Sequence, residues 1–308
     1  MREAVAAHQL RHYGLELDPD REVQVTFGAT EGLAAALLAL VGAGDEVLVL
    51  DPAYDSYTPI VELAGGRVQP IALEPPDWRF APVEPGPAAR VLLLNSPHNP
   101  TGRVRDEGEL ESLARLCVEH DLIALTDEVY EHLVYDGRHV PLATLPGMWE
   151  RTLTVSSIAK THSVTGWKIG WVTGPAALVE RVRGVKQFLS FAGGTPLQHA
   201  AAVGLAIDPA PLAAALRAKR DRLADGLRAV GFDVLPTAGT YFLNATLGDR
   251  DAAELCQRLP HEAGVAAIPL SAFSARDGAL RSIVRFAFCK REEVLDQAIV
   301  RLRTWKGG

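Results

Sequence analysis

Residues 152–171 constrain the fold of this chain most strongly, because they place a lysine directly after an apolar strand. Leu153 and Val155 alternate with small hydroxyl residues, which is typical of a buried strand, and Lys160 follows among small and apolar neighbours. Burial penalises an ammonium ion, so a lysine in this place is expected to act through its neutral amine. A neutral amine can form a Schiff base with an aldehyde.

Two other residues of the same segment indicate a phosphate site near that amine. Ser157 lies three residues before Lys160, and Lys168 lies eight residues after it. A hydroxyl group and a cation can together hold a phosphate through charge-assisted hydrogen bonds. The competing interpretation is an ordinary surface lysine after a strand, and the segment alone leaves it open.

A turn nearer the start of the chain predicts the rest of an anion site. Residues 23–27 alternate as a short strand and run into the turn 28–32, GATEG, which opens an apolar helix. Free backbone N–H groups at a helix start bind anions, so Ala29 and Thr30 are candidate phosphate ligands. The G-x-G-x-x-G fingerprint of dinucleotide-binding folds is absent from this turn, which argues against an NAD-dependent dehydrogenase.

Two further apolar strands end in polar residues. Residues 91–94 run into a turn that contains Asn99-Pro-Thr-Gly, and residues 122–126 deliver Asp127. A carboxylate directly after a buried strand needs a partner, and a cation is the strongest one. Open α/β sheets bind ligands at the carboxyl edge of their strands, so a ligand is expected there.

In this order the motifs resemble those of the class I and II aminotransferases, which are fold-type I enzymes that use pyridoxal 5′-phosphate (PLP). The resemblance rests on five matching motifs: the Gly28 turn, Tyr54, Asn99-Pro-Thr-Gly, Asp127-x-x-Tyr130 and Ser157-x-x-Lys160 with Lys168 in Thr-Gly-Trp-Lys-Ile-Gly. Lysine at position 168 resembles the kynurenine- and methionine-type subgroup. Residues 188–198, 264–273 and 284–290 are similar to succinyldiaminopimelate aminotransferases.

The resemblance implies an α/β fold of the aspartate aminotransferase type. Residues 1–195 would form a large PLP-binding domain around a mostly parallel sheet, and residues 196–308 a smaller α+β domain. Only 27 residues precede Gly28, fewer than in the family, so the N-terminal arm that covers the substrate is expected to be missing. The family also implies a homodimer.

The resemblance assigns a role to each matching residue. Lys160, Asp127 and Tyr130 would be catalytic. The residues that would bind the cofactor are Ala29, Thr30, Tyr54, Asn99, Asp127, Tyr130, Ser157, Lys160 and Lys168. Arg285, together with Asn99, would bind the substrate. An arginine in the middle of a strand usually pairs with a carboxylate, which is either that of a ligand or an internal Asp or Glu.

The net charge and the composition of the chain limit which binding partners and which cellular compartment are expected. The chain of 308 residues has a formal net charge of −7, which argues against nucleic acid. Its longest apolar run, residues 33–41, is too short to span a bilayer, and no signal peptide opens the sequence. Cys117, Cys256 and Cys289 are widely separated, which indicates a reducing, cytoplasmic setting and predicts no metal site.

The sequence therefore predicts a PLP-dependent aminotransferase that exchanges an amino group between an amino acid and a 2-oxo acid, with glutamate and 2-oxoglutarate as one pair. The finer resemblance points to N-succinyldiaminopimelate and lysine biosynthesis. The alternatives are a kynurenine- or methionine-type aminotransferase and a C–S β-lyase, which needs the same lysine and aspartate. An alternative of another class is a truncated, inactive PLP-binding module.

Overall fold

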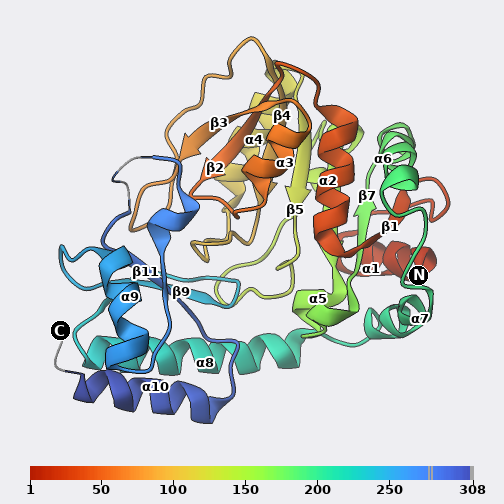
Figure 1. Ribbon diagram of the computed structural model, residues 1–308. Coiled ribbons are helices and arrows are strands. Elements are labelled where there is room, and N and C mark those ends of the chain that lie inside the picture. The colour runs from red at the N-terminus through yellow and green to blue at the C-terminus, as the bar shows by residue number, and fades with distance from the viewer. Residues whose placement is uncertain (277, 279, 306–308) are drawn as a thin grey trace.

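The computed structural model describes residues 1–276, 278 and 280–305, and its larger sheet has seven strands (Figure 1). The strand order is β1-β7-β6-β5-β4-β2-β3, and only β7 runs antiparallel to its two neighbours. The sheet is therefore mostly parallel, as predicted. Its strands are β1 (Val23–Phe27), β2 (Glu46–Asp51), β3 (Arg67–Ala72), β4 (Ala89–Asn95), β5 (Ile123–Asp127), β6 (Thr152–Ser157) and β7 (Ile169–Thr173).

Helices cover both faces of this sheet, which explains why its central strands are apolar throughout. Along β4, Val91 and Leu93 pack on one face and Leu92 and Leu94 on the other. The first face is covered by α2 (Gly28–Leu40), α3 (Tyr57–Leu63) and α6 (Ala176–Leu189), and the second by α4 (Glu107–Glu119).

The end of the sheet formed by β1 and β7 is covered by α1 (Arg2–Tyr13) and α7 (Thr195–Gly204). Val5 of α1, Trp171 of β7, and Ala201 of α7 belong to one apolar cluster. Because α7 packs on the large sheet, we propose that the boundary between the domains lies between α7 and α8 rather than at residue 195.

A second, four-stranded antiparallel sheet forms the core of the C-terminal part. Its order is β10-β11-β9-β8, and α8 passes beneath it with α10 alongside (Figure 1). Tyr130 and Leu133, which follow β5, pack into the core of this sheet and so join the two parts. The elements are α8 (Ala210–Ala229), β8 (Asp233–Val234), β9 (Phe242–Thr246), α9 (Ala252–Glu262), β10 (Ile268–Pro269), β11 (Ile283–Ala287) and α10 (Glu292–Thr304).

Residues 165–167 form a turn of 3₁₀ helix, and β7 begins at Ile169. The strand β3 carries no clear alternation and contains Pro70, which is compatible with its position at the edge of the sheet. Among the described residues, none of the helices has the length and apolar character needed to cross a bilayer.

Candidate active site

A cavity of about 560 Å³ lies between the two sheets, at the carboxyl edge of the larger one. The central strands bring their last residues together there, because Asn95 of β4 pairs in register with Asp127 of β5 and β6 follows alongside. Every residue that the sequence singled out lines this cavity, namely Ala29, Thr30, Tyr54, Asn99, Asp127, Tyr130, Ser157, Lys160, Lys168 and Arg285.

Lys160 lies in α5 (Ile158–Thr161), a single helical turn that follows β6 directly. Its ammonium donates a hydrogen bond to the hydroxyl of Tyr241, with 2.9 Å between nitrogen and oxygen. The same nitrogen lies 5.7 Å from the ring centre of Tyr130 and 5.4 Å from that of Tyr241. The amine is thus held by one hydroxyl and two aromatic faces.

Asp127 is a buried carboxylate with two neutral hydrogen-bond donors. The Tyr57 hydroxyl donates to Oδ2 at 2.7 Å, and the Val129 N–H donates to Oδ1 at 3.3 Å. Burial raises the pKa of Asp127 to about 6, and these hydrogen bonds and the charge of Lys160 offset the effect only in part. A cation placed against this carboxylate from the cavity would stabilise its charged form.

Arg285 of β11 reaches the turn that follows β4. Its Nη1 donates to Oδ1 of Asn99 at 2.7 Å, and its guanidinium carbon lies 4.0 Å from the ring centre of Phe242 and 4.2 Å from that of Phe273. The backbone N–H of Asn99 donates to the side chain of Asn95 at 2.6 Å, which fixes the turn. Because this hydrogen bond goes to a neutral amide, the positive charge of the guanidinium can still pair with a carboxylate that enters the cavity.

The start of α2 and the start of β7 meet at one end of the cavity, and this end could bind an anion. Gly28 opens the helix with φ of 68°, and no side chain caps its first turn. A Cβ atom at Gly170 would lie 2.5 Å from the carbonyl carbon of Gly28, so only glycine permits this close approach. Ser157 and Lys168 line the same cavity, and the free N–H groups of the helix add to their attraction for an anion.

Sequence reasoning missed four aromatic residues of the site. Tyr57 follows Tyr54 by three residues at the start of a helix, and this spacing could have indicated that both face the same way. Tyr241, Phe242 and Phe273 gave no signal, because they reach the cavity only through the packing of the smaller sheet against the larger one.

Known proteins are similar to this chain over nearly its whole length. The family model described as aminotransferase class I and II matches residues 1–302. A Mycobacterium tuberculosis protein described as probable N-succinyldiaminopimelate aminotransferase DapC is 49% identical, over 98% of this chain and 81% of its own length. The kynurenine–oxoglutarate transaminase 3 of Rattus norvegicus is 37% identical, over 95% and 73%. The solved structure of N-succinyldiaminopimelate aminotransferase from M. tuberculosis superposes with a TM-score of 0.94 and covers 98% of this chain and 82% of that one.

Proposed function

The chain belongs to the class I and II aminotransferases and transfers amino groups, and we propose that it does so with pyridoxal 5′-phosphate bound in the cavity around Lys160. The observation that carries this proposal is the meeting of an amine, a buried carboxylate and an uncapped helix start in one cavity. These groups match the aldehyde, the ring nitrogen and the phosphate of the cofactor.

The residues that line the cavity fit pyridoxal 5′-phosphate. Asp127 is buried, and its hydrogen-bond donors among the described residues are neutral, so a protonated ring nitrogen would give it a cationic partner. Gly170 lets β7 lie directly against the backbone of Gly28 and Ala29, which positions the start of α2 at the phosphate end of the cavity. We assign the phosphate to Ala29, Thr30, Ser157 and Lys168, the face of the ring to Tyr54, and its phenolic oxygen to Asn99 and Tyr130.

When bound, the cofactor supplies an electron sink for the charge left on the substrate Cα after it loses a proton. Lys160 acts as the general base that takes this proton at Nζ and later returns it. Tyr241 is the hydroxyl partner that orients the free amine. Asp127, held by Tyr57, lines the cavity and would pair with the protonated ring nitrogen of the cofactor.

Arg285 is proposed to bind the substrate α-carboxylate in the bidentate manner of a guanidinium. Phe242 and Phe273 hold the guanidinium plane between them, so its direction is fixed before the substrate arrives. As amino donor we propose N-succinyldiaminopimelate, with 2-oxoglutarate as acceptor, in lysine biosynthesis. The identity of 49% to the M. tuberculosis protein supports this choice.

We also propose that the protein is a cytoplasmic homodimer. Phe188 and Phe191, at the end of α6, are 86% and 77% exposed, and Val203 of α7 is 70% exposed. Exposed large apolar side chains within one short stretch of the chain are typical of a surface that a partner covers. A second copy of this chain is the partner that the family implies.

An absorption experiment tests the proposed function. The purified protein is mixed with the cofactor and then with glutamate, beside a Lys160→Ala variant. We expect a visible band of bound cofactor in the wild type that glutamate converts to the amino form, and no such band in the variant. A chain that binds no cofactor, or whose band ignores every amino donor, would overturn the proposal.

A panel of donors then separates the substrates. With 2-oxoglutarate as acceptor, we expect glutamate formation to be fastest from N-succinyldiaminopimelate, compared with methionine and kynurenine at equal concentration. A faster reaction with either of the other two would assign the chain to that donor. Release of pyruvate from a cystathionine-type thioether would instead indicate C–S β-lyase activity.

A further inference from the structure

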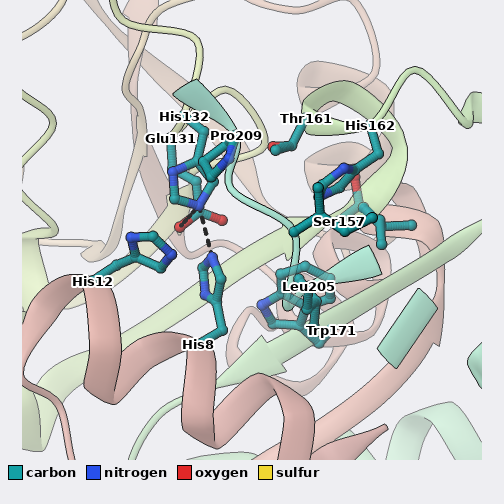
Figure 2. Close-up of a pocket in the computed structure, with 12 residues that line it drawn as sticks. His8, His12, Glu131, His132, Ser157, Thr161, His162, Trp171, Leu205 and Pro209 are labelled. Atoms are coloured by element: carbon teal, nitrogen blue, oxygen red, sulfur yellow. Dashed lines mark hydrogen bonds and ion pairs between the residues drawn. The ribbon is translucent and has the colours of Figure 1, made fainter. Parts of the chain in front are cut away.

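Three histidine imidazoles meet between α1 and the loop after β5, outside the cavity around Lys160 (Figure 2). His8 and His12 lie one helical turn apart on α1, and His132 approaches from the loop. The ring centres are 4.7, 4.9 and 4.6 Å apart. One ligating nitrogen from each ring lies within 4.8 Å of the other two, and no other such group is found among the described residues.

The distances between the histidine nitrogens include values both shorter and longer than those found in a metal site. Zinc binds imidazole nitrogens at about 2.0–2.1 Å, so in a tetrahedral site two such nitrogens lie about 3.3 Å apart. Nε2 of His8 and Nε2 of His132 are 2.7 Å apart and share a hydrogen bond, as the dashed line in Figure 2 marks. A cation that replaces the shared proton needs only small movements of the side chains.

The ionisation of the three rings also suits a metal. Burial lowers the pKa of His8 to about 4, and burial likewise lowers the pKa of His12 and that of His132. Neutral imidazoles offer a lone pair to a cation at neutral pH. Nε2 of Gln9 lies 3.4 Å from Nδ1 of His8 and can donate a hydrogen bond to it, which orients the ring.

The charged residues that act on the cluster are Glu131, Asp208 and Arg11. The Glu131 carboxylate lies 3.9 Å from Nε2 of His132 and accepts hydrogen bonds from Tyr13 and Ser156, each at 2.6 Å. It supplies the negative charge that a buried cation needs. Arg11 opposes it, because its Nε donates to Nε2 of His12 at 3.3 Å, but this contact is exposed and weak.

A small cavity beside the cluster contains polar atoms that lack partners. It has about 10 Å³ of free space, which is enough for one ion or one water molecule. Oγ1 of Thr161 and Nε1 of Trp171 line it, and both are buried without a hydrogen-bond partner in the part of the chain that the structure describes. A hydrated ion would supply a hydrogen-bond partner to either of these two atoms.

We propose that His8, His12 and His132 form a binding site for one divalent transition-metal ion of the zinc class, with Glu131 or water as the fourth ligand. Imidazole is a ligand that suits zinc, nickel and copper, whereas magnesium and calcium prefer oxygen. The ion would tie α1 to the loop that carries Tyr130. The sequence predicted no metal site, because the ligands from α1 and from the loop are far apart along the chain.

The test is a titration of the cofactor-loaded, tag-free protein with zinc chloride. Metals and unbound cofactor are first removed with a chelator and by dialysis, and the heat of binding and the Tm are then measured. We expect one Zn²⁺ to bind per chain and the Tm to rise, because an ion that binds only the folded state stabilises it. The absorbance of the bound cofactor should stay unchanged.

Two variants and a matched control locate the site. His12→Ala removes an exposed ligand, and His132→Gln keeps a hydrogen-bonding partner for His8 but not the imidazole. Each should weaken zinc binding at least about tenfold, while His199→Ala, which removes an exposed histidine of α7, should bind zinc like the wild type. Absence of saturable binding, wild-type affinity in both ligand variants, or equal weakening in all three variants would overturn the proposal.

Discussion

The Lys160 ammonium donates to the Tyr241 hydroxyl at 2.9 Å, although Lys160 follows a strand of the larger sheet and Tyr241 precedes a strand of the smaller one. Tyr241 stands immediately before β9 of the smaller sheet, and its ring packs edge-on against that of Tyr130 at 5.3 Å. The position of the Lys160 amine therefore depends on how the smaller sheet docks against the larger one.

Replacing Tyr241 by Phe removes this hydroxyl and keeps the ring. We expect Tyr241→Phe to lower kcat about three- to tenfold, because a lost hydrogen bond of this kind costs about 0.5–1.5 kcal/mol. KM for the amino donor should change little, since Arg285 is untouched. Steady-state kinetics checks this split, and an unchanged kcat would show that the hydroxyl has no part in orienting Lys160.

The raised pKa of Asp127 predicts an unusual dependence of stability on pH in the cofactor-free protein. Its folded-state pKa is raised to about 6, so between about pH 4 and pH 6 the folded state binds a proton that the unfolded chain has lost. The contribution of Asp127 to stability should therefore fall as the pH rises through this window, by up to about 3 kcal/mol, whereas the lowered pKa of His8, at about 4, contributes in the opposite direction. Urea unfolding of the cofactor-free protein at a series of pH values measures this change.

Asp127→Asn removes that titration. Above pH 6 the cofactor-free variant should be more stable than the wild type by up to about 3 kcal/mol, and this difference should build up between about pH 4 and pH 6. Transamination should be lost, because the ring nitrogen has no carboxylate partner. Asp249→Asn, at an exposed turn, is the control and should leave both properties unchanged. An equal pH slope in wild type and Asp127→Asn would contradict the assignment.

Arg285→Lys tests the substrate anchor. Lysine keeps the positive charge but loses the planar fork that pairs with a carboxylate and lies between Phe242 and Phe273. We expect KM for the amino donor to rise about 10- to 100-fold, while the absorbance of the bound cofactor stays as in the wild type. A variant with normal KM would place the substrate carboxylate elsewhere.

Gly170→Ala tests the close approach of β7 to the start of α2. The added Cβ would lie 2.5 Å from the carbonyl carbon of Gly28 and 2.8 Å from the nitrogen of Ala29, and neither backbone atom can move without shifting the helix. We expect a loss of about 1–3 kcal/mol in stability and weaker cofactor binding. Gly184→Ala, on the exposed side of α6 with open space around it, is the control and should not destabilise the protein. Equal unfolding midpoints for both variants would contradict the expectation.

Much of the site could be predicted because it lies at strand ends. Asn99, Asp127 and Lys160 each follow an apolar strand, and parallel strands place their carboxyl ends at one edge of a sheet. Local patterns thus determine which groups meet, and the comparisons confirm the family and the fold. The individual roles of these residues stay predictions until the variants are measured.

The sequence alone determined the order of the strands and helices and the chemical groups at the sheet edge, since both follow from short-range patterns of apolar and turn-forming residues. Only the tertiary structure decided that Tyr241 holds Lys160, that Phe242 and Phe273 enclose Arg285, and that α1 brings two histidines to His132. These contacts join residues far apart along the chain. They depend on how packed surfaces fit together, and no periodicity in the sequence records that fit.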